Sequence, residues 1–416
     1  MKIFRNILIT VSVMIACFIA IKLLVGAAAG LSSSKNVLGI EEAGVSFEEL
    51  TIPSDARVVA LGDATCGNAE FQAAKLDMLK KMIAAGNCRS IMFDIPVGEG
   101  ALINAAIHGN GSHLTELMDE LECPYYDTQQ IIDLLAWARE YNKGRSYNNS
   151  VLFYGMEFGD TGSALEYLIE FAGVHPEAIK DGDIEKITAL AGEGTDISSE
   201  KEYFKGLYDE LSESPNVDYM IAAMTVDSIL QSIDATTLET DPAKLTQYRN
   251  LSMAGNVQSI SAIEEKRGYS QILITAHNDL VMKEATALGG DLQELFKDKY
   301  FCIGTDFYNT VVNLHTAGTY GEDYVRKDHE FCSLDILAYQ ASLFEGGRYV
   351  LVFGDVTESE SRIYTLIHED NYTGNLSDDY SLSMDLHSAY RTTVTVADRY
   401  DAMLYYYETT PIRILR

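Results

Sequence analysis

Polar side chains stand at the ends of four apolar segments, and their types are suited to chemistry. Asp63 and Cys66 follow the first segment, Asp94 ends the second, His277 ends the third and Glu157 ends the fourth. Carboxylates and imidazoles transfer protons at a reacting centre, and a thiolate attacks carbonyl carbons. Short apolar runs predict buried strands, and parallel strands gather their carboxyl ends at one edge of a sheet. We therefore expect these side chains to line one crevice.

Simpler roles are open for the same residues. Asp63 and Thr65 are suited to capping a helix that begins near Gly67. A histidine at a strand end, such as His277, also serves to hold a neighbouring loop, and a buried thiol packs as a small apolar group.

The residues around these strand ends resemble the erythromycin esterase family. The first signature of that family reads approximately G-E-x-T-H-G-x-x-E-F-x-x-x-K/R, and this chain has GDATCGNAEFQAAK from Gly62 to Lys75. The second signature reads A-H-N-x-H, and this chain has AHNDL from Ala276 to Leu280. Further similar segments, in the same order, are FYG at 153–155, DLLAWAREYN at 133–142, RNLSMAGNV at 249–257, IGTDFYN at 303–309 and YDAMLYYYETTPIRIL at 400–415.

The resemblance implies both a fold and a reaction. The fold is α/β, with a central, mostly parallel sheet flanked by helices and an inserted helical region. The reaction is hydrolysis of an ester or lactone by a water that a histidine activates. The resemblance assigns Asp63, Cys66, Asp94 and His277 to the catalytic centre, and Glu70, Lys75 and Asn278 to binding or support. A metal site from Asp63, Glu70, Asp94 and His277 is conceivable, but no tight ligand spacing supports one, and we expect no cofactor.

Several positions depart from the family pattern. Cys66 and Leu280 replace histidines, Asp63 and Asp94 replace longer glutamates, and Gly255 replaces another glutamate. A thiol has an ordinary pKa of about 8.5, against about 6.5 for imidazole, so it is a poorer base at neutral pH. A carboxylate withdrawn by ~1 Å costs on the order of a hundredfold in rate. We therefore expect impaired hydrolysis in a pocket that persists.

Two alternatives to an impaired hydrolase remain open. Cys66 is suited to act as a nucleophile if a helix N-terminus lowers its pKa and His277 serves as its base. The protein would then be an active hydrolase with an altered centre. The other alternative is an interaction module outside the cytoplasm that carries out no catalysis.

The N-terminal residues predict export. Lys2 and Arg5 precede an apolar stretch at residues 7–29. A helix over this stretch is long enough to cross about 30 Å of hydrocarbon, and the leading positive charges predict that the N-terminus stays inside. Small residues at 27–29 also suit removal as a secretory signal. We expect a membrane-anchored protein with its domain outside the cytoplasm, or a secreted one if the leader is cleaved.

Composition restricts the partners. The formal net charge is −31, from 31 Lys+Arg against 62 Asp+Glu, and it is spread along the chain. Nucleic acid is therefore an improbable partner, because phosphate binding needs concentrated positive charge. We expect a small-molecule ligand with an ester or lactone group, and the charge favours a cationic one. After the leader there are five cysteines, an odd number, so at least one is free or paired between chains.

The predicted organisation has three parts. Residues 1–30 form the signal anchor or signal peptide, residues 31–50 a linker and lead-in, and residues 51–416 one domain with a helical insertion at about 160–268. Apolar residues in the insertion recur at three- and four-residue spacing, which is typical of amphipathic helices. After residue 300 we expect further strands, including residues 362–370, and an exposed polar loop at 370–381.

Overall fold

The computed structural model describes residues 10–14, 16, 17, 20, 37–109, 117, 118, 123–159, 161–192, 196–316 and 325–415. Most of the predicted leader (residues 1–30) and the first six residues of the predicted linker (31–36) lie outside this set. Among the described residues, no helix combines the length and the apolar character needed to cross a bilayer. Membrane anchoring therefore stays a prediction.

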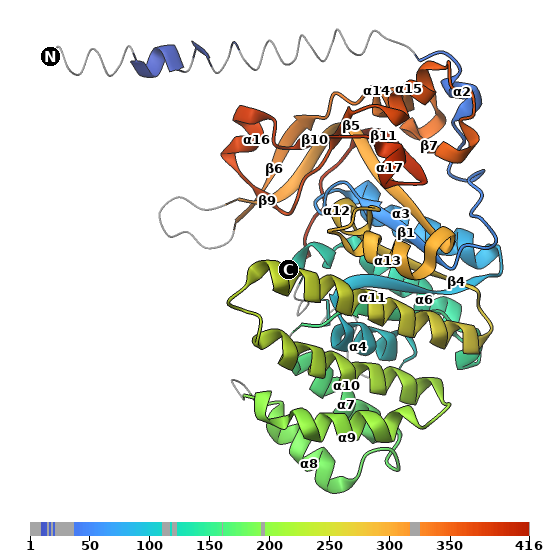
Figure 1. The fold of residues 1–416 in the computed structure, drawn as a ribbon, viewed down its shortest axis with the longest axis vertical. Coiled ribbons are helices and arrows are strands. Elements are labelled where there is room, and N and C mark those ends of the chain that lie inside the picture. The colour runs from blue at the N-terminus through green and yellow to red at the C-terminus, as the bar shows by residue number, and fades with distance from the viewer. Residues whose placement is uncertain are drawn as a thin grey trace, which may run out of the picture.

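A nine-stranded sheet runs through the middle of the described chain (Figure 1). Its main path is β3-β2-β4-β1-β5-β11-β7, and the six strands from β3 to β11 are parallel to their neighbours. The edge strand β7 is antiparallel, as is β6, which forms a hairpin with the far end of β5. The mostly parallel sheet predicted from the sequence is therefore confirmed. The strands are β1 (Val58–Asp63), β2 (Cys88–Pro96), β3 (Leu152–Glu157), β4 (Gln271–His277), β5 (Tyr300–Thr316), β6 (Val325–Cys332), β7 (Arg348–Val352), β8 (Asn371–Gly374), β9 (Asp379–Tyr380), β10 (Arg391–Val394) and β11 (Ala402–Thr409).

Helices cover both faces of this sheet. In β1, Val58 and Ala60 pack into one apolar core with side chains of α4, α7, α10 and α11, while Val59 and Leu61 pack into a second core with α3 and α6. A strand buried on both faces needs apolar residues at nearly every position, which explains the unbroken apolar run of β1. The helices are α2 (Ile40–Ala43), α3 (Ala69–Ala84), α4 (Val97–Ile107), α6 (Gln129–Asn142), α7 (Thr161–Val174), α8 (Asp181–Leu190), α9 (Lys201–Ser212), α10 (Val217–Thr236), α11 (Pro242–Arg267), α12 (Asn278–Val281), α13 (Leu288–Phe296), α14 (Ile336–Gln340), α15 (Arg362–His368), α16 (Leu382–His387) and α17 (Val396–Arg399).

Helices α7 to α11 separate β3 from β4 along the chain and stack together in the lower half of Figure 1. The longest of them, α11, has clear start and stop signals. Asp241 accepts the backbone N–H of Lys244 and Pro242 occupies the first turn, while Gly268 ends the helix with a φ of 96°. This helix lies against β3 and β4, so it carries side chains to the sheet.

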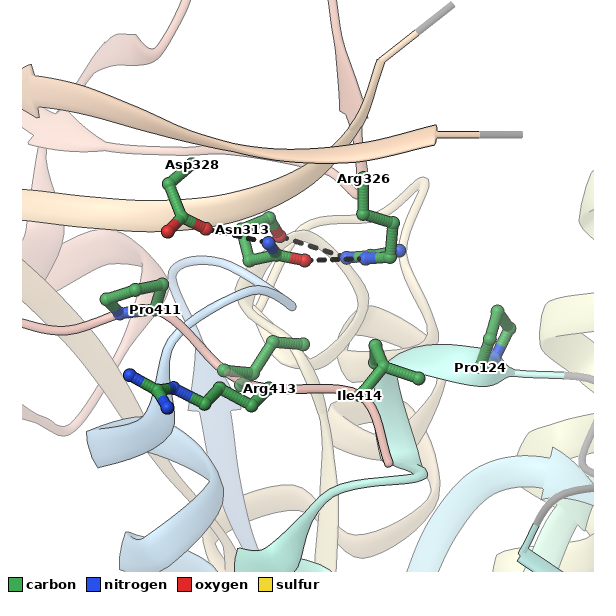
Figure 2. Close-up of a pocket in the computed structure, with 8 residues that line it drawn as sticks. Pro124, Asn313, Arg326, Asp328, Pro411, Arg413 and Ile414 are labelled. Carbon is green, nitrogen blue, oxygen red and sulfur yellow. Dashed lines mark hydrogen bonds between the residues drawn. The ribbon is translucent and has the colours of Figure 1, made fainter. Parts of the chain in front are cut away.

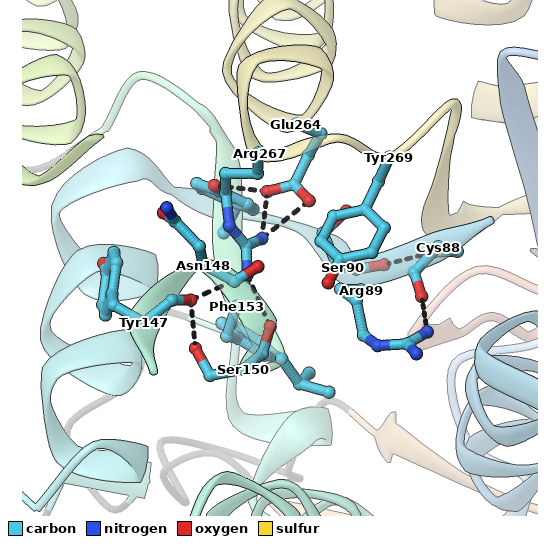
Figure 3. Close-up of polar contacts among 12 residues, drawn as sticks. Cys88, Arg89, Ser90, Tyr147, Asn148, Ser150, Phe153, Glu264, Arg267 and Tyr269 are labelled. Atoms are coloured by element: carbon cyan, nitrogen blue, oxygen red, sulfur yellow. Dashed lines mark hydrogen bonds and ion pairs between the residues drawn. The ribbon is translucent and has the colours of Figure 1, made fainter. Parts of the chain in front are cut away.

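A buried ion pair fixes the end of α11 to the sheet (Figure 3). Arg267 donates to both carboxylate oxygens of Glu264, at 2.6 and 2.7 Å, and neither side chain is exposed to solvent. Tyr154 of β3 donates its hydroxyl to the same carboxylate at 2.8 Å, and Arg267 also donates to the carbonyls of Tyr147 and Ser150. The pair therefore joins α11, β3 and the loop before β3.

Two predictions for the C-terminal third are wrong. Residues 362–368 form α15 rather than a strand, because the Ser361 side chain accepts the N–H of Tyr364 and caps a helix there. The loop after β8 is not simply exposed. Leu376 is fully buried and donates its backbone N–H to the carbonyl of Ala64, while Gly374 donates its N–H to Asp306. Backbone groups, which sequence polarity does not report, hold this loop on the sheet.

Candidate functional site

Four neighbouring strands bring the polar residues at their ends to one edge of the sheet. Along β3-β2-β4-β1 these residues are Glu157, Asp94, His277 and Asp63. Asp63 and His277 are direct register partners on β1 and β4. Residues far apart in the chain therefore lie side by side at the carboxyl ends of parallel strands, where sites in α/β folds form.

Asp63 forms a buried ion pair with Lys75. The Lys75 ammonium, carried by α3, contacts Oδ2 of Asp63, and the two residues are 0% and 2% exposed. The other carboxylate oxygen, Oδ1, is buried without a hydrogen-bond partner in the described structure. Burial raises the pKa of Asp63, and the positive charge of Lys75 opposes that shift. Asp63 therefore does not cap α3, and one of its buried oxygens has no hydrogen-bond partner among the described residues.

Asp94 lies in the same cluster. The hydroxyl of Tyr126, from a short 3-10 helix at Pro124–Tyr126, donates to its Oδ1. Burial raises the pKa of Asp94, against the Tyr126 hydrogen bond and the positive charges of Arg249 and Lys75. The Lys75 ammonium lies 5.8 Å from the centroid of the Tyr126 ring, so the two aspartates share one cationic neighbour.

Glu157, at the end of β3, forms an ion pair with Arg249 of α11 through both of its carboxylate oxygens. Burial raises the pKa of Glu157, and Arg249 opposes the shift. The inserted helices therefore reach the strand-end edge through a guanidinium group.

Cys66 carries a protonated thiol. Burial raises its pKa well above the ordinary value, and the negative charges of Asp378, Asp94 and Asp63 add to that shift. It precedes α3, whose first residue is Ala69. The arrangement is the reverse of the electropositive surroundings that activate a cysteine. The six cysteines are all free thiols in this structure.

Both ring nitrogens of His277 are used by backbone groups. Nδ1 accepts the N–H of Asp279 at 3.2 Å, which leaves the proton on Nε2, and Nε2 donates it to the carbonyl of Leu376 at 3.0 Å. The ring thus caps α12 at one side and holds the loop after β8 at the other. This is the simpler of the two roles that the sequence left open for His277.

The predicted supporting residues have structural partners. Asn278 exchanges two hydrogen bonds with the backbone of Thr305, at 2.8 and 3.2 Å, and so joins β4 to β5. Glu70 accepts the N–H and the hydroxyl of Thr410, both at 2.7 Å, and so fastens the residues after β11 to α3. Of the three predicted supporting residues, only Lys75 contacts one of the aspartates, Asp63.

Metal ligands do not converge within the described part of the chain, where no group of three His, Cys, Asp or Glu side chains lies close enough to hold an ion. Glu70, one of the conceivable ligands, is directed at Thr410 instead.

Two cavities lie near the strand ends, although neither is lined by Asp63, Cys66, Asp94 or His277. The first, of about 560 Å³, is shown in Figure 2, and its lining residues Asn313 and Ile412 both donate a backbone N–H to the carbonyl of Gly67, next to Cys66. A β-carbon at Gly67 would lie 2.1 Å from the carbonyl oxygen of Asn313, so the turn packs tightly there. The second cavity, of about 570 Å³, is lined by Glu157, Arg249 and residues of the inserted helices.

Three contributors to the site were missed at the sequence level. Tyr126 gave no motif, and its hydrogen bond to Asp94 depends on tertiary packing. Arg249 lies in a segment that resembles the family, and a buried carboxylate such as Glu157 needs a cationic partner, so their pairing had a usable signal. Asp378 belongs to the loop that we expected to be exposed, yet its charge raises the pKa of Cys66.

The chain matches the sequence model of a family described as erythromycin esterase over residues 83–409. The match begins after the first signature, so it does not bear on Asp63, Cys66 or Lys75. No curated protein matches the chain in sequence.

Three solved structures share the fold. A succinoglycan biosynthesis protein has a TM-score of 0.70 and 16% identity, over 90% of this chain and 97% of its own. A protein from Bacillus cereus has a TM-score of 0.70 and 16% identity, over 93% of this chain and 99% of its own. An erythromycin esterase mutant in its open conformation has a TM-score of 0.57 and 14% identity, over 86% of this chain and 91% of its own. At these identities the likeness shows the fold alone.

Proposed function

Since the chain belongs to the erythromycin esterase family, we propose that it is an exported member that binds a small organic ligand at the strand-end edge and does not hydrolyse it through a histidine-activated water. The observation that carries this proposal is the state of His277, whose two ring nitrogens are both engaged by backbone groups. No free imidazole nitrogen is then available there to take a proton from water.

The thiol at position 66 does not replace the missing base. Its pKa is raised by burial and by three surrounding carboxylates, so it neither accepts a proton nor attacks a carbonyl at neutral pH. Leu280 stands where the family signature has its second histidine, and a leucine side chain has no proton to exchange.

The cavities support a ligand of drug-like size. Pockets for small molecules usually measure about 300–1,000 Å³, and both cavities beside the strand ends fall in that range. In the second cavity, Asp196 and Glu239 add carboxylates to the lining, while Arg249 is already paired with Glu157. We therefore favour a ligand with a cationic group, and an ester or lactone carbonyl agrees with the family.

The test is hydrolysis of erythromycin and of simple aryl esters by the purified protein, compared with the variants Cys66→Ala and Cys66→His. We expect the wild type and Cys66→Ala to give the same rate as buffer, because neither has a base at position 66. Cys66→His restores the imidazole of the family signature and reports whether the pocket can still use one. Turnover by the wild type that disappears in both Cys66→Ala and His277→Ala contradicts the proposal.

Binding is measured separately from turnover. A ligand that prefers the native state raises the unfolding temperature in proportion to the logarithm of its concentration. We expect erythromycin or a related ester to stabilise both the wild type and Cys66→Ala. If no ligand of the panel changes the unfolding temperature, the proposed binding function is contradicted. The alternative of an interaction module without a pocket function then remains.

A second candidate is an altered hydrolase that uses a carboxylate as its base. The observation in its favour is Oδ1 of Asp63, which is buried and has no hydrogen-bond partner among the described residues. A carboxylate with a raised pKa is a more competent base than an ordinary one. Turnover that survives in Cys66→Ala but is lost in Asp63→Asn would favour this candidate, provided that circular dichroism shows a folded variant.

A further inference from the structure

A smaller cavity lies at the other edge of the sheet, away from the strand ends. It has a volume of about 130 Å³, and its walls include Tyr147, Tyr167, Phe171, His175, Glu170 and Asp218. Tyr147 precedes the first residue of β3 by five positions, whereas Glu157 is the last residue of that strand. The strand-end residues and this cavity are therefore at opposite ends of β3.

Aromatic rings form much of this wall. Tyr167 and Phe171 lie one turn apart on α7, with ring centroids 6.3 Å apart and planes at 30°. The Phe171 ring lies 4.8 Å from the ring of His175, which follows the helix. Tyr147 approaches from the loop before β3, which Arg267 holds by its backbone carbonyl (Figure 3). The rings come from separate, well-anchored segments.

Two carboxylates complete the cavity. Glu170 has no hydrogen-bond or ion-pair partner among the described residues, and burial together with the charge of Glu166 raises its pKa. Asp218, in the first turn of α10, lies 3.5 Å from Nε2 of His175, and its charge contributes to the raised pKa of Tyr147. The described lining includes neither lysine nor arginine. The cavity thus combines aromatic surface with the carboxylate of Asp218, which lies beside His175, and the carboxylate of Glu170, which has no cationic partner among the described residues.

We propose that this cavity is a binding site for a small methylated ammonium group, held by the rings of Tyr147, Tyr167 and Phe171 and by the carboxylates of Glu170 and Asp218. Aromatic rings attract cations through their negative faces, and methylated ammonium ions are recognised in aromatic cages of this composition.

Size and hydrogen bonding exclude other ligands. A cavity of roughly 150 Å³ holds a benzene ring, so a group of that size fits here. A metal ion needs several free ligands, but both nitrogens of His108 are already bonded, to the carbonyl of Asn104 and the hydroxyl of Ser150. An anion would meet two carboxylates.

The experiment uses choline chloride as the probe and 3,3-dimethylbutan-1-ol as a neutral molecule of the same shape. Saturation-transfer NMR on the purified full chain reports contact of the methyl protons, and calorimetry gives the affinities. We expect choline to bind and the neutral alcohol to bind about tenfold more weakly or less, because only the cation gains from rings and carboxylates. No choline signal, or equal affinities for the two molecules, overturns the proposal.

Two matched variants locate the site. Glu170→Gln removes a charge from the cavity, and Glu166→Gln removes the same charge one turn earlier on α7, outside the lining. We expect choline affinity to fall about tenfold in the first variant and clearly less in the second, because Glu166 acts on the cavity only through its field at Glu170. Equal effects of the two variants would overturn the proposal.

The binding site proposed at the strand ends is tested independently. Glu239→Gln removes a carboxylate from the second strand-end cavity and leaves the cavity beside α7 unchanged, so choline affinity stays at the wild-type value in that variant if the cavity beside α7 is the site. Loss of choline binding in Glu239→Gln would place the cation at the strand ends and overturn this inference, while leaving the proposed function intact.

Discussion

At the scale of single residues, the strand-end cluster differs from a hydrolytic centre because Cys66 and His277 both hold protons that a catalytic base would have to lack. The thiol of Cys66 keeps its proton because burial and the carboxylates of Asp378, Asp94 and Asp63 all disfavour a thiolate. The proton of His277 is fixed on Nε2 by the carbonyl of Leu376. His277 cannot exchange its proton with a substrate without breaking contacts that hold the backbone.

The state of Cys66 can be measured by alkylation. We expect iodoacetamide to modify Cys66 in the native protein about tenfold or more slowly than in the unfolded protein, because each unit of raised pKa lowers the thiolate fraction tenfold. Mass spectrometry of the peptide carrying Cys66 gives both rates. A faster reaction in the native protein would reveal an activated nucleophile and favour an altered hydrolase.

The sequence predicts which residues stand at the strand ends, but it does not predict the direction in which their side chains point. Asp63 and His277 are both strand-end residues, and the apolar runs before them were enough to predict that. The direction of the His277 ring depends on Leu376, a residue 99 positions away in a loop whose polar composition suggested exposure. Only the folded chain brings the two together.

At the scale of elements, β8 is held at its end by a buried acid, Asp306, which lies beside a second buried acid, Asp335. Asp306 of β5 accepts the N–H groups of Phe307 and Gly374, at 2.7 and 2.9 Å. Asp335, before α14, accepts the N–H of Leu337. Burial raises the pKa of Asp306 well above its usual range, and the negative charge of Asp335 adds to this shift. Burial also raises the pKa of Asp335, to about 6.

This pair predicts a dependence of stability on pH. Both folded-state pKa values lie above the unfolded value of about 3.9, so the folded state binds more protons and the pair's contribution is complete below pH ~4. The part due to Asp335 is lost as the pH rises through about 6, its folded-state pKa, and the part due to Asp306 is lost as the pH rises through that residue's own raised pKa. We expect the unfolding temperature to fall less between pH 5 and pH 8 in Asp306→Asn than in the wild type.

The control for this measurement is Asp355→Asn, which changes an exposed carboxylate. Its stability is expected to follow the wild type across the same pH range. If the unfolding temperature of Asp306→Asn falls with pH as steeply as that of the wild type, the two buried acids do not change their protonation on unfolding.

The ion pair at the end of α11 makes a second prediction at this scale. Arg267→Met leaves the carboxylate of Glu264 buried without its cation, and we expect it to lower the free energy of unfolding by about 3–5 kcal/mol. Adding Glu264→Gln removes the isolated charge and keeps an acceptor for Tyr154, so the double variant should recover much of the loss. Urea unfolding measures both, and a single-variant loss below ~1 kcal/mol would contradict the expectation.

The inserted helices can be predicted from the pattern of neighbouring residues alone. Helices α7 to α11 follow from apolar spacing, proline positions and caps, which are properties of neighbouring residues. The misassigned segment, α15, has apolar residues that also suit a strand, and the cap from Ser361 decides its conformation. The link from Arg249 to Glu157, by contrast, spans 92 positions and depends on how α11 lies against the sheet.

At the scale of the whole molecule, the distribution of charge suits a protein that attracts cations. The net charge of −31 gives a negative field around the chain, and field of that sign raises the local concentration of cationic ligands. From the sign of this field we expect nucleic acid and acidic surfaces to be disfavoured as partners. Both proposed ligand sites, at opposite ends of β3, fall within it.

The predicted leader is tested by fractionation of cells that make the full chain. We expect the protein to sediment with membranes and to be digested by protease added outside intact cells, because the apolar stretch at 7–29 follows positive charges. A variant that begins at residue 37 should appear in the soluble cytoplasmic fraction. Full-length protein in that same fraction would contradict the prediction of export.

The fastening of the turn at Gly67 has a consequence for biosynthesis. Gly67 accepts the N–H of Ile412, and Glu70 is joined to Thr410 across 340 positions. A ribosome therefore exposes β1 and α3 long before it makes the residues that complete their hydrogen bonds. Until translation reaches that point, the nascent polypeptide carries an unfinished turn, and any early termination codon upstream of Thr410 leaves it so permanently.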